Sequence, residues 1–310
     1  MLPKIEDYEQ FIGREKIKEI KSMAFKLEGK HIVHINSTYS GGGVAEILNS
    51  MVLLMNRLGI KTDWRLLKGS HSFFDVTKKF HNALQGGRVS FTKEDKRIYL
   101  DELERNALMH HFDEHDLVFV HDPQPLGLIK FVRKKEQPWI WRSHIEIRHA
   151  NRKIWAFLHN FARHYDGAVF SMPKYKKRDL DIPQFFVAPS IDPLSLKNKE
   201  LGESQIKKII SREGIPLNKP IITQVSRFDK WKNPLGVLSI FRKVQERVDA
   251  DLVLIGDMAS DDPEGPKIYN AIVKQAEKMK GVHIITKKDD LLVNALQRFS
   301  TVVLQNSKRE

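Results

Sequence analysis

The chain has 310 residues, no cysteine and a formal net charge of +13 at pH 7, with 41% hydrophobic and 29% charged residues. Its length favours two domains over one core, and the lack of cysteine excludes a disulfide framework and thiol catalysis. The sequence has no apolar run long enough to cross a bilayer and no apolar signal segment at its start, so we expect a cytoplasmic protein that does not enter a membrane.

The first half of the chain alternates between expected helices and strands. A lead-in helix over 15–27 closes at Gly29, and a strand follows over 31–35. A regular apolar stripe then predicts a helix from 44 to 58, which ends at Gly59. Further strands are expected over 61–67, 117–120, 139–141, 167–170 and 185–188, and further helices over 69–86, 100–111 and 151–163. This order is typical of a parallel sheet covered on both faces, as in Rossmann-like domains.

Polar segments follow several of these strands. The first strand runs into Asn36-Ser-Thr-Tyr-Ser-Gly-Gly-Gly43, where a ligand could approach the backbone closely and N–H groups are free at the mouth of a helix. The same loop can also be a tight turn that only packs the helix on the sheet. Asp122 follows the strand over 117–120 and is a candidate for binding a sugar hydroxyl, although Asp before Pro is also a common turn starter.

The second half repeats the pattern in a shorter form. Two prolines and polar residues over 189–195 indicate a linker, which gives domains over 1–190 and 191–310. The expected elements are a helix over 204–212, strands over 221–225, 251–256, 282–286 and 301–304, and helices over 235–248, 265–279 and 291–299. The chain stops at Glu310, where another helix would be expected, so we predict an incomplete second domain.

One loop in the second half concentrates positive charge. Arg227, Lys230 and Lys232 lie between the strand over 221–225 and a helix for which Asn233 is a good N-cap and Pro234 a good first residue. Carboxyl ends of parallel strands and helix N-termini are where open sheets bind anions. We interpret the loop as a diphosphate-binding site; the alternative is a solvated loop whose cations bind nothing.

Five motifs together resemble one enzyme family. They are His34-Ile-Asn-Ser-Thr-x-x-Gly-Gly-Gly-Val-Ala-Glu46, Phe73-Phe-x-x-Thr-Lys-x-x-His-Asn-Ala-Leu-Gln-Gly86, His121-Asp-Pro-Gln-Pro125, Trp141-Arg-Ser-His-Ile145 and Ser226-Arg-Phe-Asp-Lys-Trp-Lys-Asn-Pro234. The chain resembles retaining GT-B glycosyltransferases of the trehalose glycosyltransferring synthase and trehalose phosphorylase group. The resemblance implies two Rossmann-like domains whose parallel sheets face an interdomain cleft.

The resemblance also implies roles for individual residues. The donor phosphates and sugar would be bound by Gly42, Gly43, Arg227, Lys232 and Glu310, the last as the first glutamate of an E-x7-E motif that is truncated here. His144 would sit by the reacting sugar, with Arg227 and Lys232 neutralising the diphosphate during catalysis. Asp122 would hold the acceptor.

The expected function is therefore a retaining glucosyl transfer. A nucleotide-diphosphate glucose, UDP- or ADP-glucose, would donate glucose to free glucose and give α,α-trehalose, with no further cofactor and no metal because the cations stabilise the leaving charge. We see no carboxylate cluster with metal-ligand spacing, and we take the scattered histidines as core or surface groups. The alternatives are a trehalose phosphorylase and a shortened, non-catalytic protein that binds a sugar or a nucleotide.

Two other classes of protein fit less well. A dehydrogenase would need an acidic residue at a strand end after the glycine loop, and Asp63 lies near that distance but at the start of its strand. The basic charge favours anionic partners, yet no block of aromatics interleaved with lysine and arginine indicates a nucleic-acid platform. We expect small-molecule sugars and nucleotide sugars as partners, no nucleic acid and no membrane, and the sequence leaves a homodimer open.

Overall fold

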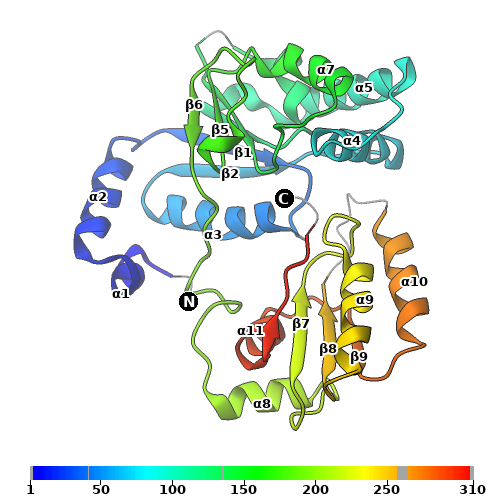
Figure 1. Ribbon diagram of the computed structural model, residues 1–310. Helices are drawn as coiled ribbons and strands as arrows, with labels where there is room; N and C mark the ends of the chain where they lie inside the picture. Colours follow the sequence, from blue (N-terminus) through cyan, green and yellow to red (C-terminus); the bar gives the residue numbers. More distant parts are fainter. Residues whose placement is uncertain (1–2, 41, 135, 257–263, 308–310) are drawn as a thin grey trace. The chain divides into compact units, whose positions relative to one another are not determined.

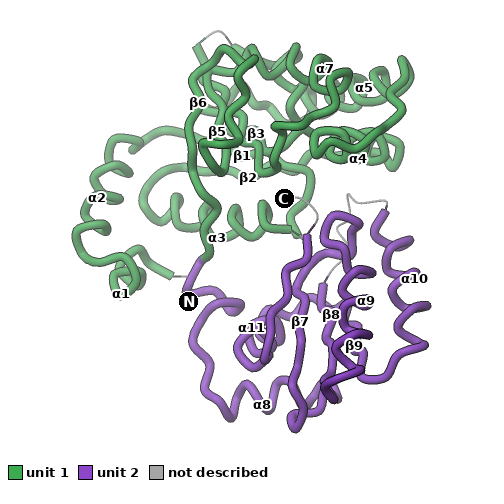
Figure 2. Tube along the Cα trace, in the orientation of Figure 1, with its two compact units in different colours: residues 1–191 green, residues 192–310 purple. Residues whose placement is uncertain are grey.

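The computed structural model describes residues 3–40, 42–134, 136–256 and 264–307. The chain divides into two compact units, residues 1–191 and 192–310 (Figure 2). Each unit is built on its own parallel sheet with helices packed against it (Figure 1). No helix within the described residues has the length and apolar character that a membrane crossing requires.

The sheet of unit 1 has the order β2-β1-β3-β4-β5-β6, and all its described pairs are parallel. Its strands are β1 (His31–Asn36), β2 (Lys61–Leu66), β3 (Leu117–His121), β4 (Trp139–Ser143), β5 (Gly167–Phe170) and β6 (Gln184–Phe186). The chain turns to one side of β1 for β2 and to the other side for β3. Such a reversal is a topological switch point, and ligands of open α/β sheets bind at the carboxyl ends of strands beside it.

Helices cover both faces of this sheet. The helical elements of unit 1 are η1 (Ile5–Tyr8), α1 (Glu9–Ile12), α2 (Arg14–Phe25), α3 (Gly43–Arg57), α4 (His71–Leu84), α5 (Lys93–His110), η2 (Phe112–Glu114), η3 (Leu126–Leu128), α6 (Ile129–Val132), α7 (Arg152–Ala162) and η4 (Pro173–Tyr175). Alternate residues of β1 serve opposite faces: Val33 and Ile35 join the core with α4, α5 and α7, whereas Ile32 packs with α2 and the end of α3. The face of His34 is therefore that of Ile32.

The predicted elements of unit 1 are largely present, and α5 differs from the prediction at its start. Helix α5 begins at Lys93, well before the expected residue 100. The cause is a capping box: Thr92 Oγ1 accepts the Asp95 N–H at 3.1 Å, and Asp95 Oδ2 accepts the Thr92 N–H at 2.8 Å. This signature satisfies two helix-end donors and starts the helix before its apolar stripe begins.

Unit 2 has a parallel sheet with the order β10-β7-β8-β9. Its elements are α8 (Glu203–Ser211), β7 (Ile221–Val225), α9 (Pro234–Gln245), β8 (Asp251–Ile255), α10 (Gly265–Ala276), β9 (Val282–Ile285), α11 (Asp290–Phe299) and β10 (Val302–Val303). In β8, Leu252 and Leu254 pack toward α9 and α10, and Val253 and Ile255 pack toward α8 and α11. Strand β7 lies between β8 and β10, so its carboxyl end is the switch point of this sheet.

Candidate active site

The loop after β7 is organised by one buried carboxylate, Asp229, which is 2% exposed. Its Oδ1 accepts the backbone N–H groups of Trp231 at 2.8 Å and Lys232 at 3.0 Å, and its Oδ2 lies 3.3 Å from Nη2 of Arg227. A charged acceptor strengthens each of these hydrogen bonds relative to a neutral one. Asp229 therefore positions both the guanidinium of Arg227 and the backbone of Lys232 at the carboxyl end of β7.

The two lysines of this loop have different surroundings. Lys232 is half-buried, and burial lowers the pKa of its ammonium; the nearby Arg227 charge acts in the same direction and Asp229 opposes it. The ammonium of Lys230 instead lies 3.2 Å from a carboxylate oxygen of Glu264, just before α10. Of the predicted cations, Arg227 and Lys232 thus lie together around Asp229, and Lys230 is paired elsewhere.

The start of α9 differs from the expected cap. The helix does begin at Pro234, as predicted, but Asn233 adopts a left-handed conformation (φ 54°, ψ 46°), and its side chain makes no capping hydrogen bond. The Asn233 side chain instead lies over Gly236, where an added Cβ would meet its Nδ2 at 2.3 Å. The expectation of a side-chain N-cap at Asn233 is therefore wrong, because the side chain fills the space above a glycine.

A close backbone approach supports the same loop from β8. A Cβ added at Gly256 would lie 1.7 Å from the carbonyl oxygen of Ser226. Ser226 N–H also donates to the carbonyl of Ile255 at 3.0 Å, which continues the β7–β8 ladder into the loop. Glycine at 256 is therefore required for the path that the chain takes into the Arg227 loop.

In unit 1, the glycine loop is held by polar side chains at its start. Asn36 donates from Nδ2 to the carbonyl of Thr38 at 2.6 Å and accepts the indole N–H of Trp64 at 2.7 Å. Gly42 is the N-cap residue of α3 and Gly43 is its first residue. A Cβ at either glycine would meet no atom of the described residues within 4 Å, so open space adjoins the backbone in the part of the chain that the structure describes.

Asp122, after β3, and His144, after β4, are brought together. Asp122 Oδ1 accepts the backbone N–H of His144 at 2.8 Å, and the carbonyl of Asp122 accepts the indole N–H of Trp141 at 3.1 Å. Asp122 has φ 64°, in the left-handed region that non-glycine residues rarely use. Its N–H donates to the carbonyl of Arg142 at 2.8 Å, so hydrogen bonds to β4 hold this conformation in place.

A chain of three imidazoles leads into the site across the sheet. Nδ1 of His34 on β1 lies 3.0 Å from Nε2 of His121 at the end of β3, and Nδ1 of His121 lies 2.9 Å from Nε2 of His144. His34 and His121 are 3% and 2% exposed. Because each neutral imidazole has one donor and one acceptor nitrogen, the hydrogen-bond directions of the three rings are coupled.

Burial keeps all three rings uncharged. It lowers the pKa of His34 to about 4 and that of His144 to about 3, with the neighbouring Arg142 charge adding to the effect at His144. The pKa of His121 is also lowered well below its ordinary value, first by burial and then by the charges of its neighbours. His144 is therefore held as a neutral ring that can donate or accept a hydrogen bond.

Several organising residues could not be found from motif roles alone. Asp229 looks in the sequence like any aspartate in a polar loop, and only its burial shows that it positions the cations. His34 and His121 stand in the quoted motifs, but their link to His144 depends on the pairing of β1, β3 and β4. The predicted donor residue Glu310 lies outside the described residues.

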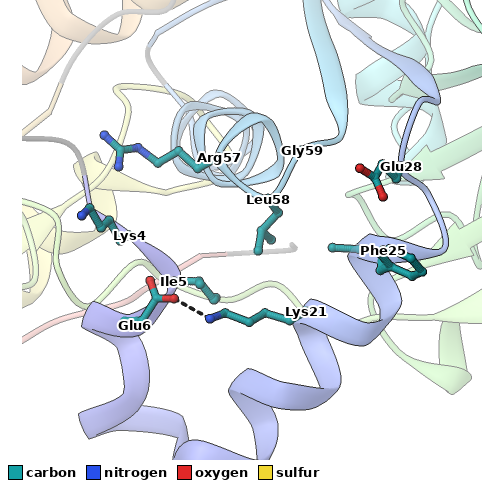
Figure 3. Close-up of a pocket in the computed structure, with 10 residues that line it drawn as sticks. Lys4, Ile5, Glu6, Lys21, Phe25, Glu28, Arg57, Leu58 and Gly59 are labelled. Carbon is teal, nitrogen blue, oxygen red and sulfur yellow. Dashed lines mark hydrogen bonds and ion pairs between the residues drawn. The ribbon is translucent and has the colours of Figure 1, made fainter.

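A separate pocket of about 500 Å³ lies in unit 1 between η1, α2 and the end of α3 (Figure 3). Its lining is mixed, with an ion pair between Glu6 and Lys21 beside the apolar Phe25 and Leu58. None of the predicted site residues that the structure describes lines this pocket. The pocket therefore adds nothing to the strand-end sites.

Two family models match the chain. Residues 34–177 match a model described as the N-terminal domain of trehalose synthase, and residues 205–310 match one described as glycosyl transferases group 1. The two matches fall within unit 1 and unit 2 respectively. Both include the strand-end loops described above.

Comparison with individual proteins leads to the same family. The chain is 44% identical over 313 residues to the trehalose synthase of Pyrococcus horikoshii, covering 99% of this chain and 75% of that protein. It is 28% identical over 362 residues to the trehalose phosphorylase of Grifola frondosa, covering 100% of this chain and 49% of that one. A crystal structure of an alpha,alpha-trehalose-phosphate synthase (UDP-forming) from Burkholderia vietnamiensis has a TM-score of 0.66 at 16% identity, and the match covers 90% of this chain and 76% of that one. The GT-B-like fold with two Rossmann-like domains, predicted from the sequence, is thereby confirmed.

Proposed function

The chain belongs to the trehalose synthase family of glycosyltransferases, and from this premise we propose that it makes α,α-trehalose from a nucleotide-diphosphate glucose and free glucose. The transfer proceeds with retention at the anomeric carbon of the donor. Unit 2 binds the nucleotide sugar and unit 1 binds the acceptor. The proposal rests on Arg227 and Lys232, because one buried carboxylate binds the guanidinium of the first and the backbone N–H of the second at the switch point of a family-matched sheet.

The cations after β7 suit a diphosphate leaving group. As the bond between the sugar and the diphosphate breaks, negative charge grows on the phosphate oxygens and the sugar becomes oxocarbenium-like. Fixed positive charges that are already partly desolvated stabilise that change without reorganising. Arg227 and Lys232 meet this requirement, because Asp229 fixes their loop and burial has lowered the pKa of the lysine. In this proposal the reaction needs no metal.

The residues after β3 and β4 suit a sugar. Asp122 supplies a carboxylate for sugar hydroxyls, and its unusual backbone conformation is fixed by hydrogen bonds to β4. His144 presents a neutral imidazole whose Nε2 is engaged by His121. A neutral ring contributes a directed hydrogen bond without adding positive charge beside a sugar that is itself becoming cationic. The open backbone at Gly42 and Gly43 offers N–H groups to the donor.

The donor is UDP-glucose or ADP-glucose in this proposal, and the phosphorylase reaction is the rival. The same cations would also serve inorganic phosphate. The identities favour the synthase, at 44% against 28%.

Calorimetric titration of the purified chain with UDP, ADP, GDP and inorganic phosphate tests the proposal. We expect one nucleoside diphosphate to bind in the micromolar range, on the order of −8 kcal/mol, and phosphate to bind far more weakly. Saturable phosphate binding with no nucleotide binding would replace the synthase proposal by the phosphorylase. Binding of neither ligand would leave the cation loop without the role given to it here.

A further inference from the structure

A second cluster of polar side chains lies toward the amino ends of β1 and β3, away from the loops at their carboxyl ends. His31 is the first residue of β1, Asp63 lies on the adjacent β2, and His115 stands just before β3. Nε2 of His31 and Nε2 of His115 each lie 3.2 Å from Oδ2 of Asp63. The glycine loop leaves the other end of β1, after Asn36, so this cluster is separate from the sugar site.

We propose that His31, Asp63 and His115 bind one divalent transition-metal ion, with Zn²⁺ as the best fit. The two imidazole nitrogens and the carboxylate oxygen all lie within 4.8 Å of one another, so a single ion can touch all three. Two histidines and a carboxylate form a ligand set that Zn²⁺ accepts, with water in the fourth position. This proposal is independent of the proposed glucosyl transfer.

The spacing agrees with tetrahedral coordination. Zinc bonds to nitrogen and oxygen are about 2.0–2.1 Å long, which puts neighbouring ligand atoms of a tetrahedron on the order of 3.3 Å apart. The two observed separations from Asp63 Oδ2 are both 3.2 Å. Asp63 thus already has the spacing of a shared ion's ligand to each histidine, and the two imidazole nitrogens lie within 4.8 Å of each other.

The second nitrogen of His115 indicates which atom is left for a metal. Its Nδ1 lies 3.3 Å from the carbonyl oxygen of Phe112, which can only accept a hydrogen bond. Its Nε2 lies 3.2 Å from Oδ2 of Asp63, which is a second acceptor, and a neutral ring has only one proton for the two. A metal ion at Nε2 would leave that proton on Nδ1 for the Phe112 carbonyl, so that both nitrogens have a partner. Such a backbone hydrogen bond to the distant nitrogen is typical of metal-ligating histidines.

His31 supplies a third observation. Its Nε2 is buried and makes no hydrogen bond to any described residue, although it lies 3.2 Å from Asp63. The side chain of His115 is 1% exposed, whereas those of His31 and Asp63 are 15% and 30% exposed. An ion can therefore enter past Asp63 and bind against a buried wall formed by His115.

Arg65 is the competing group. Its Nη2 lies 2.9 Å from the same Oδ2 of Asp63, and its side chain is 43% exposed. A guanidinium and a metal ion repel each other and share one oxygen, so the metal must displace Arg65 toward solvent. If the cluster is a metal site, removing Arg65 should increase its affinity for the metal ion. If the cluster is only a set of ion pairs around Asp63, removing Arg65 should only weaken that set.

The ligands come from distant parts of the sequence, which is why no metal-binding spacing is visible there. Parallel pairing of β1 with β2 sets Asp63 opposite Val33, two residues from His31. The Asp116 N–H donates to the carbonyl of His31 at 2.7 Å, and this hydrogen bond places the neighbouring His115 beside His31. A bound ion would tie the edge strand β2 to β1 and to the turn before β3. It would therefore stabilise unit 1 without entering the transfer reaction.

The test uses the full chain stripped of metal with a chelator and then titrated with ZnCl₂. We expect one Zn²⁺ per chain, and for Co²⁺ in its place the visible absorption of a tetrahedral or five-coordinate site. Asp63→Asn and His115→Gln should each weaken Zn²⁺ binding by more than about 100-fold, since removal of a ligand costs more than the 10–100-fold effect of second-shell changes. Arg65→Ala should strengthen binding.

A matched control is present on α4, where His71 and Asp75 also lie 3.2 Å apart but are 81% and 50% exposed. His71→Ala should leave the Zn²⁺ affinity unchanged. If a ligand variant fails to fold, the Co²⁺ spectrum of the unaltered chain still decides the question. Absence of stoichiometric Zn²⁺ binding, an octahedral Co²⁺ spectrum, or weaker binding in Arg65→Ala would overturn the proposal.

Discussion

Replacing Lys232 by alanine gives the sharpest test of the cation loop. The ammonium of Lys232 is half-buried and its pKa is lowered mainly by burial, so it has lost part of its hydration before a diphosphate arrives. A hydrogen bond to a charged partner contributes about 1.5–3 kcal/mol, which corresponds to roughly 10–150-fold in Kd. We therefore expect Lys232→Ala to weaken nucleoside diphosphate binding by that factor.

Lys230→Ala is the matched control, because it removes the same charge from the same loop. Lys230 pairs with Glu264, and its side chain is 41% exposed. Exposed pairs contribute about 0–1 kcal/mol, so its loss should change the affinity by less than about 5-fold. Both variants are titrated calorimetrically at one salt concentration with the nucleotide that binds the unaltered chain. Equal losses of nucleotide affinity in the two variants would mean that only the overall positive charge of the loop attracts the nucleotide. An unchanged affinity in Lys232→Ala would refute the role of that residue.

Three further predictions concern the supports of the two sites. Gly256→Ala places a Cβ 1.7 Å from the Ser226 carbonyl, so we expect nucleotide affinity and the denaturation midpoint both to fall; a variant with unaltered binding would show that the loop does not depend on this contact. His121→Phe deprives two buried ring nitrogens of their partner, each at a cost of about 1–3 kcal/mol, and should lower kcat for the transfer as well as the free energy of unfolding; loss of stability with full kcat would make the chain of imidazoles purely structural. His34 has its pKa lowered to about 4 in the fold, so the unfolded chain binds a proton first as the pH falls below its ordinary value of about 6.5. Stability should therefore decline between about pH 6.5 and pH 4, by about 3 kcal/mol from this residue, and urea unfolding of His34→Asn across that range should show a smaller decline. Parallel pH profiles for the two proteins would contradict the assigned burial of the ring.

The fold could be predicted because its central strands, such as β1, β5 and β8, are buried on both faces. Strands such as β7 and β8 appear as short apolar runs, and the helices between them carry regular stripes. What the pattern missed were features set by single polar contacts. The capping box at Thr92 starts α5 early, and the space above Gly236 draws the Asn233 side chain away from a capping position.

The candidate site was predictable only where its residues are close in sequence. Arg227 and Lys232 stand in one loop, and their place between a strand and a helix already suggests anion binding. The carboxylate that organises them could not be distinguished from other loop aspartates until its burial was known. Clusters assembled by strand register, such as the imidazoles ending at His144, have no local spacing that a sequence could reveal.

In the proposed retaining glucosyl transfer, the cations after β7 act on a diphosphate leaving group. Proton NMR of reactions that contain UDP-, ADP- or GDP-glucose with glucose, and no phosphate, tests it directly. We expect α,α-trehalose from one of the donors, with the rate reduced at least about 10-fold in Lys232→Ala and nearly unchanged in Lys230→Ala. Trehalose formed only from glucose 1-phosphate and glucose, a β-linked product, or equal rates in the two variants would contradict it.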